Sequence, residues 1–267
     1  MSQPVILVPT DFTKVADTAL SHAVRIARQS NSEIKLIHVV DNADEVKATK
    51  KIIEDVAERA AEWYKLKVSG AIRIGNIFED IGDAAAELDA KLVIMGTHGL
   101  KGIQHLVGGY ALKVITHSQI PFIVVQEAAK EGNYKRIVVP LDLSKDTKQK
   151  LGITARLAEL FHSEIKVISP KTSDEFLNNQ IFRNIAFTKK FLSERNIPHT
   201  TEIIDLDGSF ANTVIGYAKK VDADLISIMS HQTMMFSNIF GESYQQKVLT
   251  NDAGIPVIAV NPKPVTV

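Results

Sequence analysis

Near its beginning the chain reads Val5-Ile-Leu-Val-Pro-Thr-Asp11, and a matching stretch occurs later as Ile137-Val-Val-Pro-Leu-Asp142. Each stretch is a run of aliphatic residues that ends in Pro, one further residue and Asp, which is typical of a buried strand followed by a loop. Asp11 and Asp142 are 131 residues apart. Repetition over such a distance indicates one domain written twice.

Further matches extend the repeat over most of the chain. Ser32-Glu-Ile-Lys35 recurs as Ser163-Glu-Ile-Lys166, and Asp89-Ala-Lys-Leu92 corresponds to Asp222-Ala-Asp-Leu225. Between the copies, residues 127–133 are polar and show no hydrophobic periodicity. A length of 267 residues also favours two domains. We therefore predict domains at residues 1–130 and 131–267.

Within the first copy, short aliphatic runs alternate with helical patterns. The runs are nearly continuous, as in parallel strands covered on both faces, and they occupy Val5–Val8, Ile34–Val40, Leu92–Met95 and Phe122–Val125. The weaker run at 71–74 is expected near a sheet edge. The alternation predicts an α/β fold with two tandem, doubly wound (Rossmann-like) domains, each with a five-stranded parallel sheet.

Apolar residues recur at helical spacing over residues 15–27 and 53–63. Thr13 and Ser144 come after the two Asp residues, where each is expected to cap a helix by accepting backbone N–H bonds. Trp63 is the only tryptophan. It falls on an apolar helical face, so we expect it in the core.

The composition of the chain argues against several classes of protein. The chain has 31 Lys and Arg and 31 Asp and Glu, which argues against a nucleic-acid-binding surface. Cysteine is absent, which excludes disulfides, thiolate catalysis and Cys-ligated zinc. No apolar run approaches the length of a membrane span or a signal peptide. We expect a soluble, cytoplasmic protein without a membrane partner.

Ligands of doubly wound sheets bind beyond the carboxyl ends of the strands. The loop after the fourth apolar run is rich in glycine, because five of the 14 glycines of the chain fall between Gly96 and Gly109. Such a loop lets backbone N–H groups converge on an anion before a helix N-terminus. The alternative is a set of turn glycines without a ligand.

Other nucleotide and catalytic motifs are missing from the sequence. It contains no Walker-type Gly-x-x-x-x-Gly-Lys-Ser/Thr, no Gly-x-Gly-x-x-Gly after the first strand and no Gly-x-Ser-x-Gly elbow. The eight histidines form no metal-binding array, and paired acids for general acid–base catalysis are not evident. We expect no catalytic residues.

The loops resemble those of the universal stress protein family in its tandem two-domain form. The resemblance covers essentially the whole chain and rests on Val8-Pro-Thr-Asp11, His38-Val39, Met95-Gly-Thr-His-Gly99, Gly108-Gly109 and Ile120-Pro121. ATP-binding members carry Gly-x-x-Gly, a nine-residue spacer, and Gly followed by Ser or Thr. Here a spacer of nine leads to Gly109-Tyr110 and a spacer of eight to Gly108-Gly109, so the phosphate-binding hydroxyl is missing either way.

The resemblance implies a stress-response module that binds ATP or another adenine nucleotide, with Mg²⁺ shared by the phosphate oxygens and with, at most, weak ATP hydrolysis. It places Asp11 near the adenosine, the backbone of Val39 at the adenine edge and the glycine amides around the phosphates. It also implies that the two copies pair through their last strands as a pseudo-dimer, with a homodimer as a further option. The candidate binding residues are Pro9, Thr10, Asp11, Val39, Met95, Gly96, His98, Gly99, Gly108, Gly109, Tyr110 and Ala111.

The second copy departs from this pattern. Gly96-Thr-His-Gly99 corresponds to Met229-Ser-His-Gln232, and Val39 corresponds to Pro170, which has no N–H group. We therefore predict one nucleotide site, in the first copy, and a degenerate site in the second. The alternative is a structural or interaction protein in which both sites are lost.

Overall fold

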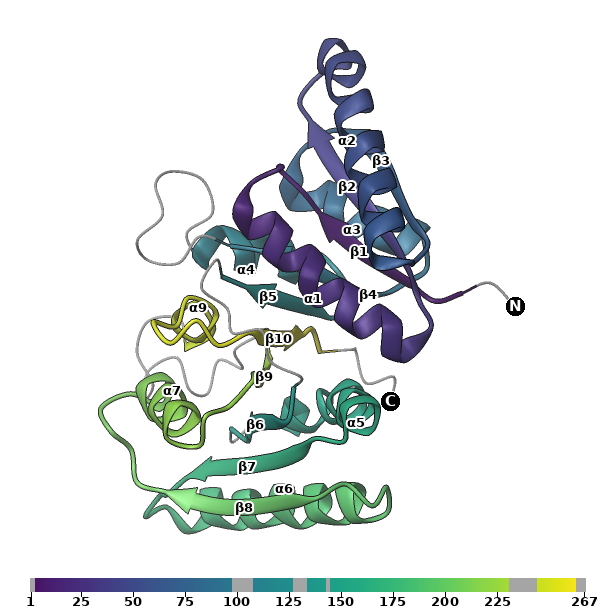
Figure 1. Ribbon diagram of the computed structural model, residues 1–267. Helices are drawn as coiled ribbons and strands as arrows, with labels where there is room; N and C mark the ends of the chain where they lie inside the picture. Colours follow the sequence, from purple (N-terminus) through teal and green to yellow (C-terminus); the bar gives the residue numbers. More distant parts are fainter. Residues whose placement is uncertain (1–2, 98–107, 127–133, 143–144, 231–243, 263–267) are drawn as a thin grey trace. The chain divides into compact units, whose positions relative to one another are not determined.

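The computed structural model describes residues 3–97, 108–126, 134–142, 145–230 and 244–262, with the backbone alone at 108–110 and 145. The chain divides into two compact units, Met1–Ala129 and Lys130–Val267. Figure 1 labels the elements of both units along the chain. Each unit alternates strands with helices, as the sequence predicts.

In its described residues the first unit contains five strands and four helices. Their bounds are β1 Val5–Pro9, α1 Lys14–Ser30, β2 Glu33–Val40, α2 Ala43–Tyr64, β3 Val68–Ile74, α3 Ile77–Glu87, β4 Ala90–Gly96, α4 Gly108–Thr116 and β5 Phe122–Val125. The strands are parallel and lie in the order β3-β2-β1-β4-β5. The weak run at 71–74 thus belongs to the edge strand β3, as expected.

The second unit repeats this order. Its elements are β6 Arg136–Pro140, η1 Lys145–Lys148, α5 Leu151–Phe161, β7 Glu164–Pro170, α6 Glu175–Ser193, β8 His199–Ile204, α7 Phe210–Lys220, β9 Leu225–Met229, α9 Tyr244–Leu249 and β10 Val257–Val260. Its strands are parallel in the order β10-β9-β6-β7-β8. The fold class predicted from the sequence, an α/β fold with parallel sheets, is therefore confirmed.

Helices cover both faces of the first sheet. In Figure 1, α1 and α2 lie on one face, and α3 and α4, which contact each other, lie on the other. This division follows from right-handed crossovers, because the chain moves one way through α1 and α2 and returns through α3 and α4. The strand order therefore reverses beside β1, which places a crevice at the carboxyl ends of β1 and β4.

Two predictions about single residues are wrong. Trp63 is 82% exposed, because the buried face of α2 runs through Ile53, Ala57 and Ala60 and leaves the tryptophan on its flank. Thr13 does occupy the N-cap of α1, but its hydroxyl donates to Asp11 and caps no helix amide. The expected cap at Ser144 lies outside the described residues.

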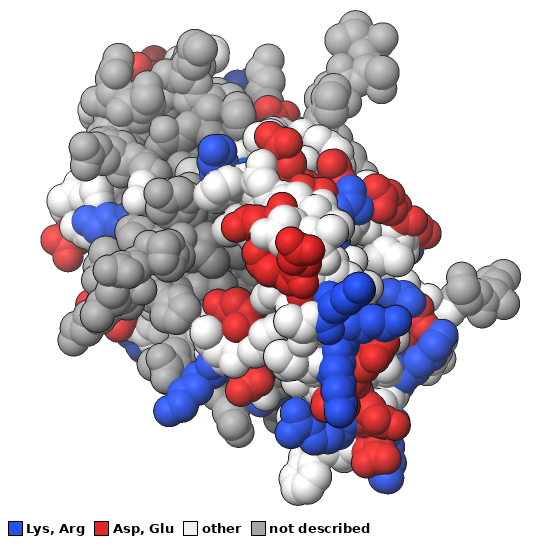
Figure 2. Space-filling model, turned by 90° about the horizontal axis from the view of Figure 1, so that it is seen from above, with Lys and Arg blue, Asp and Glu red and all other residues white. Residues whose placement is uncertain are grey.

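Charges of both signs occur together on the surface. On the face seen in Figure 2, Lys and Arg side chains lie among Asp and Glu side chains. Exposed ion pairs such as Arg136–Asp222 at 2.6 Å and Lys219–Asp252 at 2.8 Å are of this kind. Such pairs each contribute little to stability, so the fold rests on its apolar core.

Two glycines with opposite surroundings test the packing. An added Cβ at Gly152, on an exposed position of α5, would meet no atom within 4 Å, whereas at Gly70 it would lie 2.8–2.9 Å from Ile53 of α2. We expect Gly152→Ala to raise the free energy of unfolding by about 0.5–1 kcal/mol, because alanine restricts the unfolded chain. Gly70→Ala should lower it by overpacking β3 against α2. Denaturant unfolding measures both, and equal effects of the two substitutions would contradict this packing.

Candidate functional site

A cavity of about 320 Å³ opens at the carboxyl ends of β1, β2 and β4 in the first unit. Its wall is mostly apolar, with a carboxylate and an imidazole among the lining side chains. The lining residues are Pro9, Thr10, Asp11, Val15, Ala16, Ile37, His38, Val39, Ile77, Ile81, Met95, Gly96 and Val114. This volume and composition are typical of a small-molecule site at the point where strand order reverses.

Asp11 stands at the exposed rim of the cavity, where the chain leaves β1. Its Oδ1 accepts from the Thr13 backbone N–H at 3.1 Å and from the Thr13 hydroxyl at 2.5 Å. These bonds hold the carboxylate in one orientation at the start of α1. In the described part of the chain Oδ2 accepts no bond, so it remains available to a ligand hydroxyl.

His38 fixes the adjoining loop. Its Nδ1 lies 2.7 Å from the carbonyl oxygen of Thr10 and donates to it, while its ring stacks on Phe12 with centroids 4.7 Å apart. Phe12 adopts a left-handed backbone conformation, with φ of 62°. The second unit has an equivalent hydrogen bond. Ser169, at the position of His38, donates its hydroxyl to the carbonyl of Leu141 at 3.0 Å.

Gly96 ends β4 against the first turn of α1. A Cβ at this position would lie 2.7 Å from the carbonyl oxygen of Val15 and 2.9 Å from its carbonyl carbon. Because these are backbone atoms, they move away only if the start of α1 shifts. Glycine is therefore what allows α1 and the end of β4 to approach each other and to form adjacent walls of the cavity.

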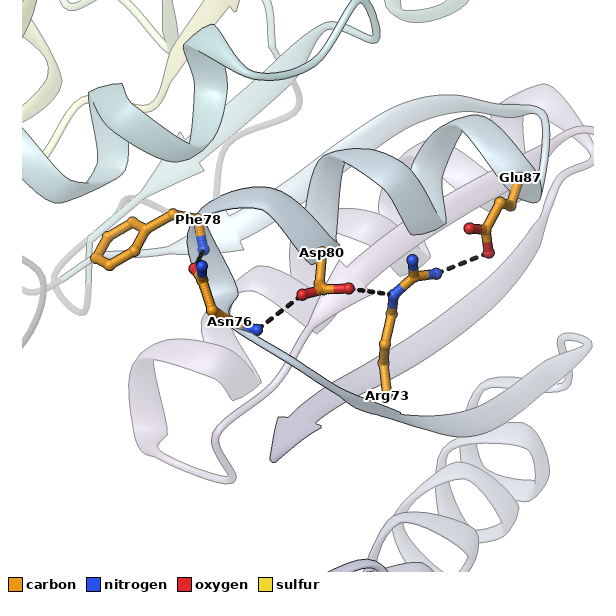
Figure 3. A network of polar contacts seen from close by, with 5 residues as sticks. All are labelled: Arg73, Asn76, Phe78, Asp80 and Glu87. Atoms are coloured by element: carbon orange, nitrogen blue, oxygen red, sulfur yellow. Dashed lines mark hydrogen bonds and ion pairs between the residues drawn. The ribbon is translucent and has the colours of Figure 1, made fainter. Parts of the chain in front are cut away.

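A charged network holds α3, which supplies Ile77 and Ile81 to the cavity. Figure 3 shows Arg73 of β3 reaching Asp80 at 2.6 Å and Glu87 at 2.7 Å, while Asp80 also accepts from the Asn76 backbone N–H. Hydrogen bonds from Arg73 lower the pKa of both carboxyl groups. The network therefore fastens α3 to the edge of the sheet, with Asn76 capping its first turn.

The structure brings together half of the residues that the sequence proposed. The residues that line the cavity are Pro9, Thr10, Asp11, Val39, Met95 and Gly96. Gly108, Gly109 and Tyr110 form the first turn of α4, and Ala111 is buried in that helix without lining the cavity. His98 and Gly99 lie outside the described residues.

Sequence reasoning missed the helical wall of the cavity. Val15, Ala16, Ile77, Ile81 and Val114 line it from α1, α3 and α4. Their apolar spacing predicts helices but does not separate side chains that face the sheet from those that face a ligand. The one usable signal is Ala16, a small residue in the first turn after the Asp11 loop.

The corresponding place in the second unit is built differently. The backbone N–H of Ser230 donates to the carbonyl of Val260, as the backbone N–H of Thr97 donates to the carbonyl of Val125 in the first unit. Met229, just before Ser230, therefore occupies the position of Gly96. The helix start also changes: α1 begins at Lys14, whereas the second unit has the short 3₁₀ helix η1 there and α5 begins only at Leu151. We attribute the change to Met229, because a side chain at this position leaves no room for a helix turn like that of Val15.

Bulky side chains lie around this second crevice. Lys150, at the position of Ala19, is buried and donates to the Thr147 hydroxyl at 3.0 Å. Burial lowers the pKa of Lys150 to about 8, and the nearby Asp142 opposes the shift. Phe210, at the position of the cavity residue Ile77, stacks on the buried Tyr244 with centroids 5.4 Å apart.

Comparison with known proteins agrees with this architecture. A profile of the universal stress protein family matches residues 4–126 and again residues 133–261. The chain belongs to the universal stress protein family. Among the described residues of this universal stress protein, no helix is long and apolar enough to span a membrane, and no cluster of His, Asp or Glu is placed to hold a metal ion.

Three relatives illustrate the range of similarity. Universal stress protein MJ0531 of Methanocaldococcus jannaschii is 29% identical over 143 residues, which are 47% of this chain and 84% of that protein. A universal stress protein of Archaeoglobus fulgidus has 16% identity and a TM-score of 0.78, covering 98% of this chain and 99% of its own, a likeness in fold. Another structure from Archaeoglobus fulgidus, in complex with dAMP, covers 46% of this chain and 96% of its own, with 20% identity and a TM-score of 0.38.

The buried lysine gives the second unit a pH dependence. Below about pH 8, Lys150 is charged in the folded and the unfolded chain, and the full cost of burying the charge is present. Between about pH 8 and its ordinary pKa of 10.5, the unfolded chain holds the proton more tightly, so stability rises with pH, by up to about 3 kcal/mol.

We expect Lys150→Met to remove this rise while keeping the unit folded, because methionine fills a similar volume without a charge. Denaturant unfolding of both proteins at several pH values between 7 and 10.5 measures the difference. Parallel pH profiles of the two proteins would show that Lys150 is not buried as described.

Proposed function

We propose that the first unit binds an adenine nucleotide in the cavity at the ends of β1, β2 and β4, with ATP and Mg²⁺ as the first candidates. The observation that supports this proposal is the cavity itself, with apolar walls, a fixed carboxylate at its rim and Gly96 at its floor. Some homologous universal stress proteins bind nucleotides, as the complex with dAMP illustrates for its own protein.

The described residues fit the nucleoside part of such a ligand. An adenine ring needs a narrow apolar slot, which Val15, Ile81 and Met95 offer from three elements. Val39 would meet the edge of the base through its backbone. The Oδ2 of Asp11 would accept a ribose hydroxyl, while Thr13 holds the other oxygen.

The phosphates would lie toward the start of α4. Because β4 leads through residues 97–107 to α4, that helix begins at the carboxyl edge of the sheet. Its first residues, Gly108 and Gly109, add the positive end of the helix dipole and backbone N–H groups that have no acceptor within the helix. When bound, Mg²⁺ would supply neutralisation of the phosphate charge, with phosphate oxygens as its main ligands.

Binding, rather than turnover, is the proposed output. The ionisable side chains among the lining residues are Asp11 and His38, and both are already bonded within the loop, Asp11 to Thr13 and His38 to the Thr10 carbonyl, which favours binding over catalysis. The second unit then serves as a structural partner, because Met229 and Phe210 stand where Gly96 and Ile77 line the cavity of the first unit. The alternative is a structural stress protein that binds no nucleotide in either unit.

Thermal unfolding with and without Mg-ATP tests the proposal. At a ligand concentration about 100-fold above Kd, binding should stabilise the first unit by about 2.7 kcal/mol. Asp11→Ala removes a charged acceptor from the ligand and should weaken binding by about tenfold or more. The corresponding change in the second unit, Asp142→Ala, should leave the Mg-ATP shift intact.

The two variants make the assignment specific. An equal loss of the Mg-ATP shift in both would place the ligand elsewhere. If Mg-ATP shifts neither unit of the unmodified protein, the nucleotide proposal fails and the structural alternative remains.

A further inference from the structure

Exposed apolar side chains are concentrated on two helices. Eight large hydrophobic residues are exposed in the described part of the chain, and five of them belong to α2 or α6. These helices are counterparts, since each comes after the second strand of its unit. Single exposed apolar residues are ordinary, whereas a concentration of them marks a surface that another molecule covers.

Helix α6 carries an open groove on its outer face. The groove has a volume of about 540 Å³ and is lined by Phe176, Asn179, Phe182, Arg183 and Ala186. Phe176 is 63% exposed and Phe182 is 57% exposed. The small side chain of Ala186 leaves a hollow between larger neighbours, so the groove has room for an aromatic side chain.

One basic residue, Arg183, lines this groove, two lysines follow it along α6, and the acidic Asp174 and Glu175 precede it. Arg183, Lys189 and Lys190 are exposed on α6, against one acidic residue in the helix, Glu175. Within the described residues Arg183 forms no ion pair, and Lys190 reaches only Glu194 at 3.9 Å. The groove on α6 therefore favours an apolar segment that carries acidic residues.

Helix α2 presents such a segment. Ile52, Val56 and Trp63 are spaced at 4 and 7 residues, so they lie along one side of the helix. Asp55, Glu58 and Glu62 are exposed beside this side of the helix, and the exposed Arg59 lies on it between Val56 and Trp63. Trp63 is the most exposed large apolar side chain in the described part of the molecule, at 82%.

We propose that copies of this chain associate through α2 of one copy lying on α6 of another, with Trp63 entering the groove between Phe176 and Phe182. Pairing of α6 with α6 would oppose Arg183 and the lysines to themselves, and pairing of α2 with α2 would oppose the acidic residues of that helix. Like charges at an interface are costly, so the complementary pairing wins.

This interface is heterologous, because it joins two different surfaces. Each associated pair therefore leaves one α2 and one α6 uncovered, and further copies can add. A contact between two helices is at the small end of specific interfaces, so the association is weak and reversible. Because the charges are exposed, it weakens as salt is added.

Mixing two variants tests the proposal directly. Trp63→Ser removes the binding surface on α2, and Phe182→Ser removes the groove on α6. Sedimentation of the full-length protein should show association that increases with concentration, whereas each variant alone should be monomeric. An equimolar mixture should form a pair and stop there, because each variant retains one intact surface. Ile74→Ser, which changes an exposed residue at the end of β3, should associate like the unmodified protein.

Fluorescence adds an independent readout, since Trp63 is the only tryptophan. Its emission should shift to shorter wavelength as the protein is concentrated and return as salt is added. The same shift should appear when Phe182→Ser is titrated with Trp63→Ser.

Three results would overturn the proposal. They are a protein that stays monomeric at every concentration, a single variant that associates like the unmodified protein, and a mixture of variants that stays monomeric. Far-ultraviolet circular dichroism of each variant confirms that the exposed substitutions leave the fold intact.

Discussion

The close approach of Gly96 to the carbonyl of Val15 is the constraint on which the first unit's cavity depends. With 2.7 Å between a hypothetical Cβ and that oxygen, only glycine lets β4 end directly beneath the first turn of α1. The two elements then form adjacent walls, and the Asp11 loop closes a third side. A single missing side chain thus links the path of the backbone to the presence of a ligand-sized space.

The second unit lacks this constraint, and its crevice differs accordingly. Met229 replaces the glycine, the first helical turn becomes η1, and Lys150, Phe210 and Tyr244 pack around the corresponding crevice. The strand order stays the same, and so does the hydrogen bond from β7 to the loop after β6. Duplication therefore preserved the scaffold while the two crevices diverged.

The sequence predicted the fold because buried parallel strands are continuous apolar runs and because the repeat supplies each run twice. It predicted the loop half of the cavity, including Asp11 and Gly96, because loops at strand ends carry distinctive residues. It misplaced Trp63, because helical periodicity does not fix which of two neighbouring faces meets the sheet. It also gave no sign of Lys150 as a buried charge, because lysine is usually exposed and only the three-dimensional packing shows its burial.

The stoichiometry of nucleotide binding tests the central claim most directly. Equilibrium dialysis of the full-length protein against Mg-ATP counts bound nucleotides per chain. The cavity beside Gly96, and the buried side chain of Met229 at the corresponding place in the second unit, predict one nucleotide per chain at saturation. Two per chain would contradict the account of the second unit, and none would contradict the account of the first.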